Sequence, residues 1–273
     1  MKKVYLSRHA GKPLAEFLIN QGYEINTVTE YGIINQLTTD IDRTLGLVRN
    51  EDGSLSSTKT IHVDKRIATH PDIYMCQLGL WNEAGIFVGD PERLRPDYPN
   101  DIIYNAVCTR DYVFHRIENT DRDLMDAIIT WRQGLACESH SDSDGSFREE
   151  TKVIGVRQGY TRCSCLPVNN DSFITSDEGI ARALEAQGAA VLLICEGHIK
   201  LRGFEHGFIG GTGGNIYINS GGITDQKAII FNGDLSTHPD FEKITGFIKS
   251  RNILPVWFED YALEDIGSIL AIE

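Results

Sequence analysis

The chain reads Gln-Gly-Tyr-Thr-Arg-Cys-Ser-Cys at residues 158–165, and this stretch begins the clearest of five similar segments. A strand-like stretch (171–176), a helical stretch (177–187) and an apolar strand (190–194) follow it in that order. Small residues within the segment permit close approach of neighbouring backbones. The sequence therefore predicts a repeated unit of strand, strand, helix and strand.

The other segments share this composition and have a polar or acidic entry. After the fourth segment come a strand (228–231), a helix (about 240–250) and a final strand (253–258), which repeats the order seen after the third. The remaining segments are residues 70–76, 100–107, 206–213 and 264–272.

The two ends of the chain supply complementary halves of one more unit. A strand (3–7), a helix (13–20) and a second strand (23–28) form the back of a unit, and residues 265–272 form a front. Joining them closes a ring of five. We therefore expect an α/β fold, a single five-bladed pseudo-symmetric α/β propeller over residues 1–273, with an open doubly wound sheet as the alternative.

Two units deviate from the pattern. The unit between Asp72 and Asp101 has no helical stretch after its second strand. The next unit carries a strand at 112–115, a helix near 123–131 and a polar insertion at about 137–150, which we interpret as a solvated loop.

Composition excludes several classes of partner. The formal charge is −13 and no basic stripe offsets it, so nucleic acid is not expected. No apolar run approaches the roughly 18 residues that span a bilayer, and the N-terminus lacks the apolar core of a signal peptide. The six cysteines show no CxxC spacing, so we expect reduced, mostly buried thiols in the cytoplasm, and neither a metal nor another cofactor. The oligomeric state stays open.

Four phrases identify a family resemblance: residues 158–163, 174–177, 207–211 and 231–234. With five such units, the chain resembles the pentein superfamily, which includes arginine and agmatine deiminases, dimethylarginine dimethylaminohydrolases and amidinotransferases. The resemblance covers nearly the whole chain and is weakest across 116–152. It is strongest to an uncharacterised bacterial branch that has no assigned activity.

The resemblance implies a site at one end of the central axis. There, an acidic residue and a histidine act with a cysteine, and further carboxylates hold the substrate guanidinium. A guanidinium is a planar cation with a fork of donors, so paired carboxylates suit it. Its central carbon is a poor electrophile, so a thiolate attacks and a histidine moves protons.

The chain departs from this pattern at the nucleophile. The family's cysteine lies in the last inner strand, which here places Ile266 or Gly267 at that position, and no cysteine follows Cys195. Ser268 is adjacent, but nothing close in sequence would activate it, so we expect a structural role for it.

The resemblance and the strand pattern give four catalytic candidates. His206 opens the fourth inner segment, where the family places its histidine, and His198 lies in a phrase similar to Gly-His-Ile/Val-Asp of agmatine deiminases, with Lys200 in place of the aspartate. A structural, hydrogen-bonded role is the alternative for either histidine. Cys163 and Cys165 lie in the third segment, where strand alternation sends both to one face, so either could be a displaced nucleophile.

The ligand-binding candidates stand at or near the entries of the inner segments. They are Asp72, Asp101 and Asp265, together with Asn105. Asn105 occupies roughly the position at which dimethylarginine hydrolases carry a guanidinium-binding aspartate, so a charge is lost there.

We therefore expect a protein of the pentein fold that binds a small polar or cationic ligand, similar to a guanidine or amidine, in an axial pocket without the usual cysteine. One alternative is an unconventional amidino hydrolase or deiminase that uses Cys163 or Cys165. Another is a protein-interaction module.

Overall fold

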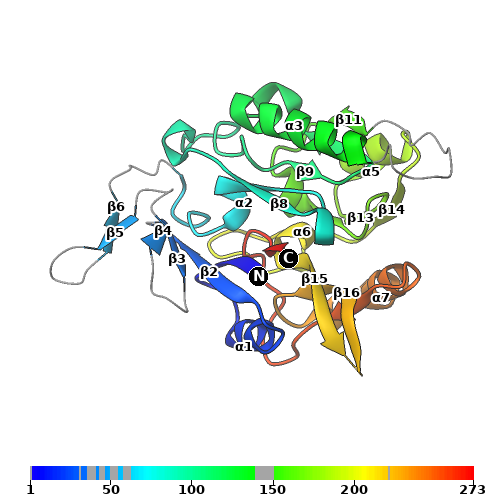
Figure 1. Ribbon diagram of the computed structural model, residues 1–273. Helices are drawn as coiled ribbons and strands as arrows, with labels where there is room; N and C mark the ends of the chain where they lie inside the picture. The colour runs from blue at the N-terminus through cyan, green and yellow to red at the C-terminus, as the bar shows by residue number, and fades with distance from the viewer. Residues whose placement is uncertain are drawn as a thin grey trace.

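Four groups of three strands repeat one pairing pattern in the computed structural model (Figure 1). In each group the first strand pairs antiparallel with the second, and the second pairs parallel with the third. A helix lies between the second and third strands, since a parallel pair requires a crossover connection. The structure describes residues 2–30, 32–35, 41–42, 47–49, 55–57, 63–138, 151–220 and 222–273.

The elements of the first, third and fourth groups follow the order that the sequence predicts, whereas the last strand of the second group was not predicted. The first group is β18 (Leu270–Ile272), β1 (Lys3–Ser7), α1 (Lys12–Asn20) and β2 (Glu24–Thr29). The second is β9 (Val107–Cys108), β10 (Tyr112–His115), α3 (Arg122–Glu138) and β11 (Lys152–Gly155). The third is β12 (Cys165–Pro167), β13 (Ser172–Thr175), α5 (Glu178–Glu185) and β14 (Ala190–Leu193). The fourth is β15 (Gly213–Ser220), β16 (Ile223–Phe231), α7 (Phe241–Lys249) and β17 (Leu254–Val256).

A fifth pair of strands has the antiparallel half of the pattern alone. Strands β7 (Met75–Leu78) and β8 (Gly85–Val88) pair antiparallel, and the 3₁₀ turns η2 (Trp81–Glu83) and η3 (Pro91–Arg93) flank β8. This unit has no α-helix after its second strand, which confirms the prediction over residues 63–138, all of which the structure describes. Strand β7 also pairs with β9, so one five-stranded sheet has the order β11-β10-β9-β7-β8.

The two ends of the chain meet in one sheet, as predicted. Strand β1 pairs antiparallel with β18, with Val4 opposite Ala271, and the ends lie side by side in Figure 1. Two further strands that the sequence analysis did not predict, β3 (Gly32–Asn35) and β4 (Ile41–Asp42), extend this sheet. Strands β5 (Leu47–Arg49) and β6 (Leu55–Ser57) form a separate pair.

Three of the predicted inner strands begin instead as single helical turns. These are α2 (Pro71–Tyr74), α4 (Thr161–Ser164) and α6 (Ile209–Thr212), and the strand starts at the residue after each turn. For α2 the cause is local, because Pro71 stands at the first helical position, where its fixed φ favours a turn. The period-2 alternation expected across these segments therefore does not apply within the turns.

Glycine allows the inner turns to approach closely. A Cβ added at Gly210 of α6 would lie 2.1 Å from the carbonyl oxygen of Arg162 in α4, so only glycine fits there. Outside the turns, the helices bury apolar faces against the sheets, as Ile244 and Ile248 of α7 do. Each such side chain contributes about 1.5–3 kcal/mol to stability by its burial.

The polar insertion lies mostly outside the described residues. Helix α3 continues to Glu138, beyond the predicted end near residue 131, and residues 139–150 are not among those that the structure describes. Among the described helices, none has both the length and the apolar character that a bilayer crossing needs.

Candidate functional site

Six polar side chains from separate parts of the chain meet among the inner turns. Each belongs to a residue that is 5% exposed or less, so the group is enclosed by the fold. We call this group the central cluster. Its members are His70, Asp72, Asn105, Cys163, Asp265 and Ser268.

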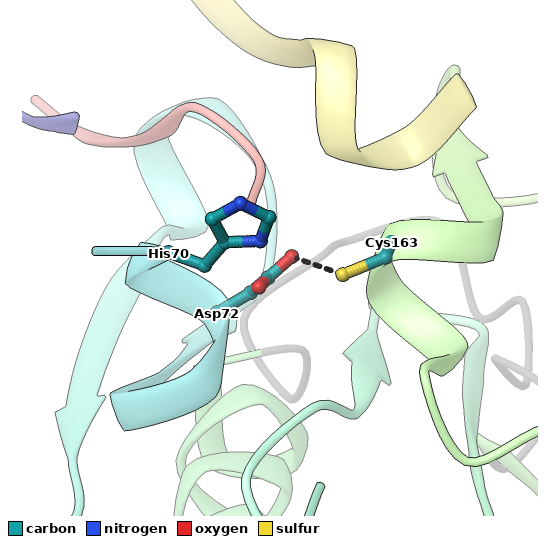
Figure 2. Close-up of side chains that lie close together, drawn as sticks. All are labelled: His70, Asp72 and Cys163. Atoms are coloured by element: carbon teal, nitrogen blue, oxygen red, sulfur yellow. Dashed lines mark hydrogen bonds between the residues drawn. The ribbon is translucent and has the colours of Figure 1, made fainter. Parts of the chain in front are cut away.

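The Asp72 carboxylate connects three members of the central cluster. Its Oδ2 accepts hydrogen bonds from Cys163 Sγ at 3.0 Å and from Ser268 Oγ at 2.6 Å. Its Oδ1 is buried and has no hydrogen-bond partner among the described residues. The His70 ring lies next to the Asp72 carboxylate and faces the Cys163 thiol in Figure 2. One potential ligand atom from each of His70, Asp72 and Cys163 lies within 4.8 Å of the others.

Asn105 fixes the positions of the groups around it. Its Oδ1 accepts from the backbone N–H of Arg162 at 2.7 Å, and its Nδ2 donates to the carbonyl oxygen of Asp72 at 3.0 Å. Its Nδ2 also lies 3.5 Å from Cys163 Sγ. The side chain that the resemblance assigned to ligand binding is therefore used to join α2 to α4.

Asp265 is the second carboxylate of the central cluster. Its oxygens accept from the backbone N–H groups of Phe208 at 2.9 Å and Gly267 at 3.0 Å, and its Oδ1 lies 4.0 Å from His70 Nδ1. Burial, and then the negative charge of Asp72, raises the pKa of Asp265 to about 7. Near neutral pH this carboxyl is therefore partly protonated.

Burial also determines the charge states of the other titratable members. It raises the pKa of the Cys163 thiol well above its usual value, and the Asp72 charge raises it further. It lowers the pKa of His70 to about 4. At neutral pH the thiol is thus protonated and the imidazole is neutral, so Cys163 needs a nearby positive charge to become a thiolate.

One buried cation already lies next to the cluster. The Arg162 guanidinium donates to the carbonyl oxygens of Gly210 at 2.9 Å and Gly213 at 3.2 Å. Burial lowers the pKa of Arg162, while the charge of Asp72 acts in the opposite direction. Arg162 thus links α4 to the segment that contains α6.

Two predicted residues occupy other environments. Cys165 lies in β12 and packs in an apolar cluster with Val107 and Phe173, and burial raises its thiol pKa. The expectation that it shares a face with Cys163 is wrong, because Cys163 lies in the helical turn before the strand. Asp101 accepts a hydrogen bond from Tyr160 Oη, and burial raises its pKa. The structure does not bring either residue into the central cluster.

The two predicted histidines also lie outside the cluster. His198 is exposed, and its ring contacts that of His238 at 5.7 Å between centroids. His206 is half-buried, with Nδ1 3.3 Å from the carbonyl oxygen of Gly207 and its ring against Phe208. The histidine that the structure places beside the thiol is His70.

The sequence alone gave no site role to His70, Arg162 or Ser268. For His70 the sequence carried a signal, namely its position. It stands immediately before the turn of the first inner segment, and the matching position in the third segment is also occupied by a ring side chain, Tyr160. For Ser268 no local signal existed. Its partner is distant, because Asp72, 196 positions away in the sequence, accepts its hydrogen bond.

Comparison with known proteins gives one match. The model of a family of unknown function (DUF6873) matches residues 144–270. That range contains Cys163, Asp265 and Ser268 but not His70 or Asp72. No curated protein and no solved structure matches the chain.

Proposed function

We propose that the chain is a pentein-type propeller of five units, closed around the central cluster. The support is that hydrogen bonds join the inner segments in cyclic order, from the first to the fifth and back to the first. The links are Asn105 Nδ2 to Asp72 O, Arg162 N to Asn105 O, Arg162 Nη1 to Gly210 O, Ser268 N to Gly211 O, and Asp72 N to Gly267 O.

We further propose that this centre binds a small cation of the guanidine or amidine class. The observation that carries the proposal is the enclosure of two carboxylates, Asp72 and Asp265, in one cluster. The charge of Asp72 raises the proton affinity of Asp265, and a bound cation relieves that repulsion. A planar amidinium also offers paired donors to carboxylate oxygens. The proton that Asp265 holds near neutral pH is released when such a cation binds.

Calorimetric titration with matched ligands tests this proposal. Guanidinium and amidinium compounds should bind the full chain, whereas neutral urea analogues of the same shape should not. Asp265→Asn should weaken binding at least about tenfold, which corresponds to about 1.4 kcal/mol. Asp101→Asn is the matched control, since Asp101 is an equally buried carboxylate outside the cluster. Equal binding of neutral analogues, or equal weakening by both variants, would contradict the proposal.

A second candidate function is hydrolysis of an amidine through Cys163. The observation that favours it is the contact of Cys163 Sγ with Asp72 beside His70. A bound cation stabilises the thiolate, which can then attack the central carbon of the ligand. The Cys163 proton passes along the existing hydrogen bond to the Asp72 carboxylate and from there to the leaving nitrogen as the C–N bond breaks. Water then hydrolyses the covalent adduct and restores the Cys163 thiol.

Treatment with a chloroacetamidine reagent, followed by peptide mass mapping, tests the second candidate. We expect an adduct on Cys163 and none on Cys165 or Ser268, together with release of an amine or ammonia from a true substrate. Ligand binding without any adduct or product would leave binding as the function and exclude hydrolysis through this thiol.

A further inference from the structure

We propose that His70, Asp72 and Cys163 form a binding site for a divalent transition metal ion of the zinc type. This inference concerns a different ligand from the organic cation above and does not depend on it. The three side chains supply an imidazole nitrogen, a carboxylate oxygen and a sulfur, and these atoms lie within 4.8 Å of one another (Figure 2).

The spacing matches what such an ion requires. Zinc lies about 2.3 Å from sulfur and about 2.0–2.2 Å from nitrogen or oxygen, so its ligand atoms are about 3–4 Å apart. Cys163 Sγ and Asp72 Oδ2 are already 3.0 Å apart. Small side-chain rotations therefore bring all three atoms to bonding distance. Three protein ligands leave a fourth position for water or substrate, as in catalytic zinc sites.

A second observation points to a missing ligand at the same place. Asp72 is fully buried, and its Oδ1 has no hydrogen-bond partner among the described residues. Buried carboxylate oxygens are normally satisfied, and an unpaired one is costly. A metal ion bound between Asp72 and its two neighbours satisfies this carboxylate without any change in the backbone.

The charges also balance. Metal binding replaces the S–H bond of Cys163 with a metal–sulfur bond, and the thiol proton leaves to the buffer. The divalent charge then neutralises the Cys163 thiolate and the Asp72 carboxylate. Asp265 remains as the carboxylate for an organic cation, while the Arg162 guanidinium keeps its carbonyl partners.

Cobalt titration of the chelator-stripped full chain tests the site. We expect one Co²⁺ per chain, retained on desalting and displaced by Zn²⁺, with a thiolate-to-cobalt charge-transfer absorption. Cys163→Ser should abolish that absorption and weaken binding by at least about 100-fold, beyond the 10–100-fold typical for partners outside the ligand set. His70→Asn should weaken binding while keeping the absorption.

Matched controls separate this site from other thiols and from the ligand proposed above. Cys195→Ser removes a cysteine that is exposed and lies outside the cluster, and it should leave the cobalt spectrum unchanged. Asp265→Asn should keep the charge-transfer absorption although it weakens amidine binding. Amidine titrations on chelated protein measure the first proposal alone, so either proposal can fail while the other holds.

The wild-type chain provides a measurement that does not depend on the folding of any variant. Zn²⁺ should release about one proton per ion bound and should protect Cys163 from slow alkylation, as read by peptide mass mapping. A charge-transfer band that survives in Cys163→Ser would overturn the proposal, as would absence of retained cobalt or equal alkylation of Cys163 with and without Zn²⁺.

Discussion

At the residue scale, Asp72 has the largest consequences because two side chains donate hydrogen bonds to its buried carboxylate. Ser268 reaches it from the last inner segment, and Cys163 reaches it from the third. Hydrogen bonds to a charged group contribute more when both atoms are shielded from water. The contribution of the Ser268 hydrogen bond to the free energy of unfolding therefore depends on its burial.

Two serine variants with bonds of equal length measure that dependence. Ser268 Oγ donates to Asp72 at 2.6 Å inside the fold, and Ser236 Oγ donates to Asp234 at 2.6 Å on an exposed turn. Ser268→Ala should lower the free energy of unfolding by about 1.5–3 kcal/mol, whereas Ser236→Ala should lower it by less than about 1 kcal/mol. Urea denaturation measures both variants. Equal losses of unfolding free energy would show that burial does not strengthen the Ser268 hydrogen bond.

His115 gives a prediction about pH. It lies fully buried in β10, with Nδ1 2.7 Å from Thr120 Oγ1, and burial lowers its pKa to about 4. The unfolded chain, with an ordinary value near 6.5, therefore binds more protons between about pH 6.5 and pH 4. The stability from keeping His115 neutral is present above this window and is lost as the pH falls through it, by up to about 3 kcal/mol.

His115→Asn should therefore reduce the fall in unfolding free energy between pH 7 and pH 5, although its stability at pH 7 is lower. Exposed His198 serves as the control, since His198→Asn should leave the pH profile unchanged. Urea denaturation at several pH values measures both variants. Parallel profiles for wild type and His115→Asn would show that another group carries the acid sensitivity.

At the scale of elements, the outer parts of the units could be predicted from the sequence and the inner parts could not. Apolar periodicity located α1, α5 and α7 to within two residues at each end, because these elements bury one face against a sheet. The inner segments are polar, short and packed against one another, so distant contacts determine their shape. Ser268, whose φ is 70°, illustrates this, since its conformation and partner depend on other segments.

Glycine substitutions test how tightly the inner turns are packed. A Cβ at Gly211 of α6 would lie 1.9 Å from Asp265 Oδ1, whereas a Cβ at Gly246 of α7 meets nothing within 4 Å. Gly211→Ala should destabilise the fold by several kcal/mol, because backbone or carboxylate must move. Gly246→Ala should stabilise it by about 0.5–1 kcal/mol, since Gly246 lies on an exposed helical face. Thermal unfolding of the two variants measures this contrast.

At the scale of the whole molecule, the pairing of the chain ends joins the first strand to the last. Lys3 lies opposite Ile272, and the same group continues through α1 to β2. The sequence could predict this pairing because the two ends carry complementary halves of one repeat. It could not predict that Ser268 also bonds to Asp72 of the first inner segment, since that contact depends on the conformation of the inner turns.

A circular permutant tests whether the ring is closed as we propose. A short linker joins Glu273 to Met1, and new ends are placed between Gln187 and Gly188, which are both exposed after α5. In a closed ring this exchange keeps every pairing between strands, so the permutant should unfold in one transition within about 2 kcal/mol of the parent. The control permutant opens instead after Gly211, within the inner turn beside Asp265, and should lose most of its stability. Denaturant unfolding and circular dichroism measure both chains. If the permutant opened at Gln187 lost its cooperative transition, the fold would not tolerate a link between its first and last residues. The closed arrangement of five units would then be wrong.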